Sequence, residues 1–191
     1  MPNETKKPTK KPGGWSSVRT HLATWDKTAL LSLIKPLYET APENRDFIHA
    51  RTQVGQSGEE VLDKYRGKIV EQFFPKRGEG KLKLAEARKA IRDYRRATGN
   101  LEGTAELLMT YVENGAEFTN DYGDIDGPFY SSVESALAEL AALLLGEARG
   151  MYPQFSERLA RVERLTEDIG WGFYDYVSDV VWQLEDELGD Q

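Results

Sequence analysis

The sequence predicts an all-α protein, and three observations support that fold class. Apolar residues recur at spacings of three and four through most of the 191 residues, which is the pattern of amphipathic helices. Helix-capping residues and Gly or Pro breaks separate these stretches at short intervals. No stretch has the pattern of a strand. We therefore expect eight or nine helices that pack antiparallel through short connections, as an irregular bundle or as stacked helical hairpins.

Composition predicts one helical domain behind a short tail. Residues 1–14 are rich in Lys, Pro, Thr and Gly with nothing to bury, so we expect a disordered tail there. Residues 15–191 are expected to form a single domain, because a chain of this length can bury a substantial core. The most apolar run, 136–145, is shorter than the roughly 20 residues that span a bilayer, and it contains Glu139.

The absence of cysteine excludes disulfides and thiolate metal sites. A soluble cytoplasmic protein without a cofactor is the expectation that follows.

The first part of the chain predicts four helices. Ser57 and Glu60 have the spacing of a capping box, which marks one helix start. Pro36 is expected to kink or split the second helix, because it lacks the backbone donor. The expected ranges are 16–22, 25–40, 43–54 and 58–74. The apolar stripe of the second helix contains Ala29, Leu30, Leu33, Ile34, Leu37 and Tyr38.

Five further helices are expected in the rest of the chain. Pro128 suits the first turn of one of them. The breaks between them fall at Thr98–Asn100, at Gly150 to Pro153 and at Gly170–Gly172. The expected ranges are 82–97, 101–120, 128–149, 154–169 and 173–188. Their buried positions include Leu84, Ala87, Ile91, Tyr94, Leu108, Met109, Val112, Ala116, Val133, Leu137, Leu140, Leu144, Phe155, Leu159, Val162, Ile169, Phe173, Val177, Val180, Val181, Leu184 and Leu188.

The net charge of −7 conceals a gradient along the chain. Residues 63–100 carry 12 Lys and Arg against 5 Asp and Glu, whereas residues 101–191 carry 4 against 20. Such a charge asymmetry gives information about binding partners and about which helices pack together, but it does not predict the fold. The simplest explanation is that basic and acidic helices lie against each other.

Three segments carry a resemblance to a known family. They are residues 75–97, residues 111–132 with the motif YGDID, and residues 169–180 with the motif GWGF. Together they resemble the signature blocks of a bacterial domain-of-unknown-function family of small, soluble, all-helical proteins, and residues 24–48 are similar to its N-terminal pattern. The resemblance implies the domain boundaries and no reaction. It also implies a His where this chain has Tyr174, so any chemistry of that His would be absent.

The turn between two of the expected helices concentrates carboxylates. Hard cations such as Mg²⁺ and Ca²⁺ prefer oxygen ligands, so a metal-assisted site is one interpretation. An EF-hand is excluded, because Tyr122 and Val133 would occupy the first and twelfth positions of its loop. In the alternative, Asp124 or Asp126 caps the next helix and aromatic residues hold the turn against the core. The candidate acidic site consists of Glu113, Glu117, Asp121, Asp124 and Asp126.

A glycine-bearing basic loop leads into a basic helix. The loop is a plausible anion site, although the GxxxxGK[ST] spacing of a P-loop is missing. Tyr94 falls on the buried stripe, so aromatics do not alternate with the charges as single-strand binders require. A solvated face, or a docking face for the acidic half, is the alternative. The candidate anion or nucleic-acid site consists of Lys76, Arg77, Lys81, Arg88, Arg92 and Arg95. Four of these residues are expected to form one exposed row: Lys81, Arg88, Arg92 and Arg95.

No recognisable catalytic or metal-binding constellation emerges. His21 and His49 lack a neighbouring acidic cluster and make a poor metal site. Trp171, between two glycines, is expected to pack over a helix junction, or to mark a partner contact if it is exposed.

We therefore expect a non-enzymatic helical interaction or scaffold protein that binds a protein partner or itself. A metal-assisted enzyme using the 113–126 carboxylates, and a nucleic-acid binder using residues 76–96, are the alternatives.

Overall fold

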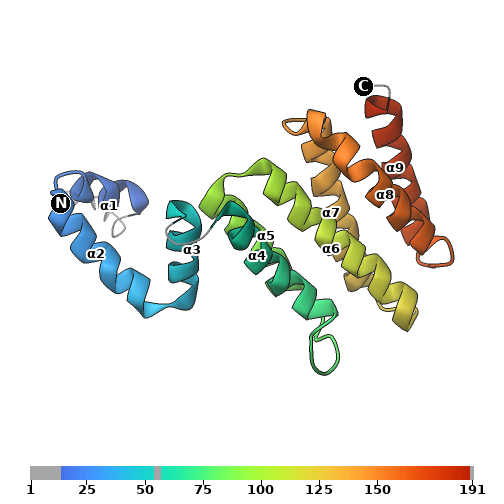
Figure 1. The fold of residues 1–191 in the computed structure, drawn as a ribbon, viewed down its shortest axis with the longest axis horizontal. Coiled ribbons are helices and arrows are strands. Elements are labelled where there is room, and N and C mark those ends of the chain that lie inside the picture. The colour runs from blue at the N-terminus through green and yellow to red at the C-terminus, as the bar shows by residue number, and fades with distance from the viewer. Residues whose placement is uncertain (1–13, 54–56, 190–191) are drawn as a thin grey trace, which may run out of the picture. The chain divides into compact units, whose positions relative to one another are not determined.

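The computed structural model describes residues 14–53 and 57–189, and the protein is all-α over these ranges (Figure 1). The predicted fold class is therefore confirmed. The described residues form nine α-helices and one short 3-10 helix, without a strand. The elements are α1 (Trp15–Leu22), α2 (Lys27–Thr40), α3 (Pro42–Thr52), α4 (Gly58–Phe73), α5 (Leu84–Thr98), α6 (Leu101–Tyr122), α7 (Gly127–Leu145), η1 (Arg149–Met151), α8 (Tyr152–Thr166) and α9 (Phe173–Leu188).

The chain divides into two compact units, Met1–Asp46 and Phe47–Gln191, and α3 contains the boundary between them. The first unit holds α1 and α2, neither of which has a buried residue. The predicted apolar stripe of α2 is therefore not a core: Ile34 and Leu37 are exposed. Amphipathic spacing identifies the face that favours burial but does not supply the element that covers it.

Two expectations about the N-terminal part have different outcomes. Pro36 lies inside α2, and the helix continues through it to Thr40. The helix is thus not split at Pro36, and a kink there stays a prediction. The predicted tail, residues 1–14, lies outside the described residues except for Gly14. The single domain over residues 15–191 stays a prediction.

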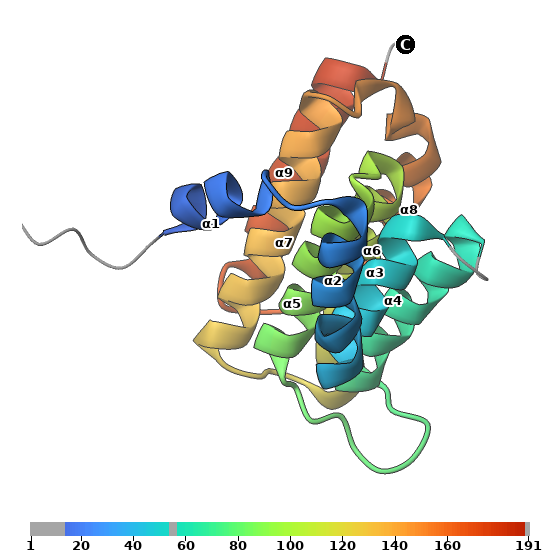
Figure 2. The ribbon, with the colours of Figure 1, turned by 90° about the vertical axis from the view of Figure 1, so that its left-hand side faces the viewer.

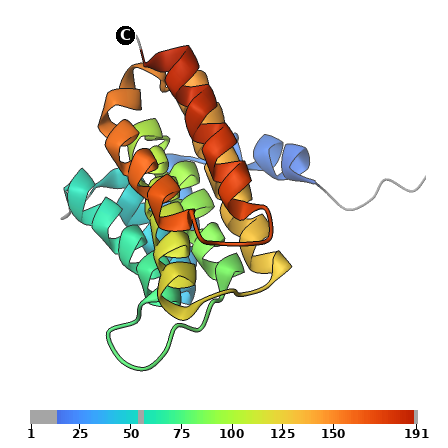
Figure 3. The ribbon, with the colours of Figure 1, turned by 90° about the vertical axis from the view of Figure 1, so that its right-hand side faces the viewer.

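The second unit is a stack of three helical hairpins, α4–α5, α6–α7 and α8–α9 (Figures 1 and 3). Helix α6 is central, because it packs against α4, α5, α7 and α8. Helix α9 packs against α7 and α8. All three hairpin turns lie at one end of the stack, where the loop between α4 and α5 extends beyond the helix ends (Figure 2). Stacked hairpins, one of the two predicted packings, describe this unit.

Local sequence signals account for the helix boundaries. Ser57 and Glu60 form the predicted capping box at the start of α4. Asn100 caps α6, because its side chain accepts a hydrogen bond from the backbone N–H of Gly103. Gly99 adopts a left-handed conformation (φ 66°) between α5 and α6, which a glycine allows at little cost.

The core of the second unit contains most of the apolar residues that the helical spacing placed inside. A group of aromatic rings occupies its centre: the ring of Phe73 lies within 5.3 Å of Tyr111 and 6.4 Å of Phe129, centroid to centroid. Leu84, Ile169 and Val180 are only partly buried. Within the described part of the chain, no single helix has the length and apolar composition to cross a membrane, and α7 with residues Arg149–Thr166 passes that test only as a pair bent by 107°.

Candidate functional site

The two helical carboxylates of the candidate acidic site point toward arginines of α8. Glu113 accepts hydrogen bonds from Nε and Nη2 of Arg158, at 2.8 and 2.6 Å. Glu117 forms an ion pair with Arg161. These pairs neutralise both carboxylates and tie α6 to α8. Among the described residues, no group of three His, Cys, Asp or Glu side chains is placed to hold a metal ion.

Arg158 is the centre of a network that joins three helices. Its Nη1 donates to Oε2 of Glu106 at 2.6 Å, and Oε1 of Glu106 lies 3.4 Å from Nη2 of Arg66 on α4. The hydrogen bonds to Glu113 and Glu106 raise the pKa of Arg158, against the opposing effect of burial. Because the Arg158 side chain is 31% exposed, the network is only partly shielded from water. We assign it a structural role between α4, α6 and α8.

The remaining carboxylates lie in or beside the acidic turn. Asp126 caps α7, because its Oδ1 accepts a hydrogen bond of 2.9 Å from the backbone N–H of Phe129. This confirms the predicted capping role for Asp126. Asp124 accepts a longer hydrogen bond, 3.4 Å, from the hydroxyl of Tyr130, and Asp121 is exposed. The turn therefore has structural partners for two of its three aspartates.

The buried hydroxyl of Tyr130 holds the turn in place. It lies 2.8 Å from Oγ1 of Thr119, and it accepts a hydrogen bond of 3.2 Å from the backbone N–H of Ile125. The same ring stacks against Trp171, with centroids 6.2 Å apart. Tyr130 thus connects the α6–α7 turn to the α8–α9 turn.

Trp171 packs over a helix junction, as predicted, and is exposed at the same time. It packs over the junction through Tyr130, yet its side chain remains 64% exposed. Its backbone is left-handed (φ 63°), and so is that of Gly172 (φ 73°), which produces the sharp turn before α9. An exposed Trp on a supported platform is compatible with a partner contact, and that role stays a prediction.

The basic candidate residues do not form one surface. Arg88 was expected to be exposed, but its side chain is only 13% exposed. Its guanidinium lies over the ring of Tyr111 at 5.6 Å, and it forms an ion pair with Glu139 of α7. The physical reason is that Glu139 of α7 lies within reach of α5, so that Arg88 covers the ring of Tyr111 while its head reaches a carboxylate.

The other five basic candidates separate into two groups. Arg92 and Arg95 are exposed on α5, and Lys81 is exposed in the loop before it. Lys76 and Arg77 instead line a hollow of about 580 Å³ against α4. The full lining of this hollow is Lys64, Gly67, Lys68, Val70, Glu71, Phe74, Lys76 and Arg77. We refer to it as the basic hollow.

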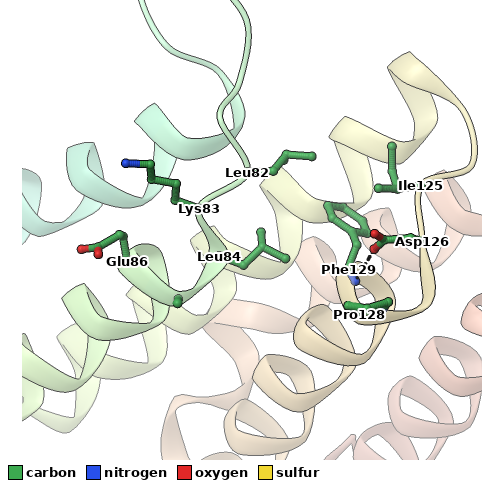
Figure 4. Close-up of a pocket in the computed structure, with 9 residues that line it drawn as sticks. Leu82, Lys83, Leu84, Glu86, Ile125, Asp126, Pro128 and Phe129 are labelled. Carbon is green, nitrogen blue, oxygen red and sulfur yellow. Dashed lines mark hydrogen bonds between the residues drawn. The ribbon is translucent and has the colours of Figure 1, made fainter.

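A second hollow, also of about 580 Å³, lies between the starts of α5 and α7 (Figure 4). Leu82, Leu84 and Ile125 extend into it beside Phe129, whereas Lys83 and Glu86 extend away (Figure 4). Its one central carboxylate, Asp126, is engaged as the cap of α7. Apart from Asp126, the side chains that extend into this hollow are apolar.

Helix α9 presents an outward face that the residue pattern alone had not singled out. Asp175, Asp179, Trp182 and Asp186 are all exposed, and their spacing of four, three and four residues places them on one side of the helix. Trp182 is 68% exposed. We call these four residues the α9 face.

The signal for the α9 face was present in the sequence. Phe173, Val177 and Val181 define the buried stripe of α9, and Trp182 falls on the opposite side. In Figure 3 the helix is visible along its whole length on the outside of its hairpin. Residues 165–191 contain no Lys or Arg, so the charged side chains of α9 itself are all acidic. The guanidinium of Arg149 reaches the C-terminal end of α9, where it donates a hydrogen bond to the backbone carbonyl of Glu187.

Comparisons with known proteins add no relative to this description. No family model, no curated protein and no solved structure matches the chain. The resemblance to a bacterial helical family therefore stays a prediction.

Proposed function

We propose that the protein is a non-enzymatic helical interaction protein, and that the α9 face is its contact surface for a basic segment of a protein partner. The observation that carries the proposal is the 68% exposure of Trp182. A large aromatic side chain in water forgoes the stabilisation of burial, and tryptophan is enriched among the residues that dominate binding energy at interfaces.

The surroundings of Trp182 specify the chemistry of the partner. Asp175, Asp179 and Asp186 flank it on the same face, and no cation lies between residues 165 and 191. A Lys or Arg side chain can pair with such carboxylates and also lie over the indole ring. The acidic face would in addition accelerate the approach of a basic partner.

The length of the α9 face fits a helical or extended segment. Its outermost residues, Asp175 and Asp186, are eleven positions apart, which corresponds to about 16 Å along a helix. A partner with basic side chains along one face would meet all three aspartates while one of its cations covers Trp182. The α9 face is backed by the core, because Val177, Val181 and Leu184 are buried behind it.

The partners of the other carboxylates favour this proposal over a metal-assisted enzyme. Glu113 and Glu117 pair with arginines, and Asp126 caps α7. A divalent cation would have to displace these interactions before it gained ligands of its own.

The proposal is tested by titrating the protein with a labelled, helix-forming peptide rich in Lys and Arg, followed by fluorescence anisotropy. Trp182→Ala is expected to raise the Kd by about tenfold or more, because removal of a central interface aromatic typically costs about 2 kcal/mol or more. Tyr122→Ala is the matched control, since Tyr122 is a similarly exposed aromatic residue (65%) that lies on α6 and not on the α9 face. Equal Kd values for the two variants, or equal binding of a Glu-rich peptide, would contradict the proposal.

A further inference from the structure

The basic hollow gathers four cationic side chains from two separate segments. Lys64 and Lys68 come from the outward side of α4, and Lys76 and Arg77 come from the loop that follows it. Glu71 is the single carboxylate of the lining, so the charged side chains sum to +3 at neutral pH. This concentration of positive charge occurs in a chain whose net charge is −7.

The hollow also has an apolar wall. Phe74 and Val70 line it, and both are half-buried. The ring of Phe74 is backed by Phe118, with centroids 5.8 Å apart, so its position is supported by the core. Lys68 is held close to the wall of α4, because its ammonium lies 4.8 Å from the centroid of Tyr65.

From this geometry we propose that the basic hollow binds a compact anion containing a pyrophosphate group, either free or as part of a nucleoside diphosphate. A charge of +3 complements a diphosphate better than a single carboxylate. The Arg77 fork can bind phosphate oxygens bidentately, while the lysines act as point charges. The volume of about 580 Å³ lies within the range typical of small-ligand sites.

The attraction comes from side chains and not from a helix end. The hollow lies along the C-terminal half of α4, where the helix dipole disfavours an anion. Arg92 and Arg95 do not line the hollow, and Arg88 is engaged with Glu139. The cations are thus grouped around one open hollow and not spaced along a track, which favours a compact ligand over a nucleic-acid backbone.

The first test is calorimetric titration of the full chain with inorganic pyrophosphate and with ADP. Each is expected to bind at one saturable site, and Lys76→Gln combined with Arg77→Gln is expected to weaken binding by about tenfold or more. The matched control is Arg92→Gln combined with Arg95→Gln, which removes the same charge from α5 and is expected to change the affinity by less than about twofold. ADP binding tighter than pyrophosphate indicates a nucleoside against Phe74, and equal affinity indicates the inorganic anion.

A second variant fills the basic hollow without changing its charge. Gly67 lines the hollow, and a Cβ at this position would meet no atom within 4 Å. Gly67→Leu is therefore expected to block pyrophosphate while α4 keeps its fold, which circular dichroism and the Tm would verify. Equal losses in the two charge variants, unchanged binding in Gly67→Leu, or binding of a single-stranded oligonucleotide without binding of pyrophosphate would overturn the proposal.

Discussion

Two glycines of α6 set how closely the hairpins approach each other. A Cβ at Gly103 would lie 2.1 Å from the hydroxyl of Tyr94, and one at Gly115 would lie 2.7 Å from Cγ2 of Val133. Tyr94 is buried and its ring packs edge-on against Tyr65, so it has little room to move. The absence of a side chain at these two positions is what allows α6 to contact both α5 and α7.

Alanine substitutions at two helical glycines are therefore expected to have opposite effects. Gly103→Ala should lower the free energy of unfolding by about 1–3 kcal/mol, because the added methyl group overpacks the contact with Tyr94. Gly67→Ala should raise it by about 0.5–1 kcal/mol, because Gly67 is exposed within α4 and alanine favours the helix. Urea unfolding of both variants checks the pair. A stabilised Gly103→Ala would show that α6 does not pack as closely as described.

The spacing of residues in the sequence predicted some side-chain roles and not others. The sequence predicted that Asp124 or Asp126 caps α7, and the structure shows that Asp126 does. The burial of Arg88 did not, because a helical pattern cannot indicate that a neighbouring helix will cover a charged position. The convergence of Lys76 and Arg77 with Lys64 likewise depends on the course of a loop, which no periodic pattern encodes.

At the scale of elements, α6 and α8 are joined by three ion pairs, which two arginines of different exposure make. Arg158, 31% exposed, contacts both Glu113 and Glu106, whereas Arg161, 54% exposed, contacts Glu117 alone. A shielded pair that shares hydrogen bonds contributes more than a solvated pair, which typically contributes about 0–1 kcal/mol.

We expect Arg158→Ala to lower the free energy of unfolding by about 1–3 kcal/mol, because Glu113 loses its arginine and Glu106 keeps only the longer contact with Arg66. Arg161→Ala is expected to change it by less than about 1 kcal/mol. Thermal and urea unfolding at low and high salt compare the two variants. If Arg161→Ala were the more destabilising change, the network around Arg158 would not be the main polar tie between these helices.

The elements themselves were largely predictable, and the contacts between them were not. The expected ranges for α4 to α9 match the structure within about three residues at each end, since most begin or end at a cap, a glycine or a proline. The exception is α7, which ends at Leu145 before Gly146 and not at the expected residue 149. The order of packing around α6 depends on side-chain shapes far apart in the sequence, such as Gly115 against Val133. For α2 the same periodicity gave a helix but no core.

At the scale of the whole molecule, ion pairs within the second unit neutralise part of the charge gradient. Arg66 and Arg88, from the basic segment, pair with Glu106 and Glu139 of the acidic half. This agrees with the expectation that basic and acidic helices lie against each other. These pairs leave part of the charge at the surface, because the basic residues Arg92 and Arg95 and the acidic α9 face remain exposed. Our two proposals therefore concern opposite charges at separate places on one stack.

The α9 face is the central element of the account, and a charge exchange tests it most directly. Asp175→Lys combined with Asp179→Lys leaves Trp182 in place and inverts its surroundings. Glu147→Lys combined with Glu157→Lys is the control, because both glutamates are exposed elsewhere and the change in net charge is the same.

The measurement is the Kd of each variant for a Lys/Arg-rich peptide and for a Glu-rich peptide of equal length. We predict that the α9 variant loses about tenfold or more in affinity for the basic peptide and gains binding of the acidic peptide. The control variant is expected to keep its preference for the basic peptide. The same preference in both variants would contradict it.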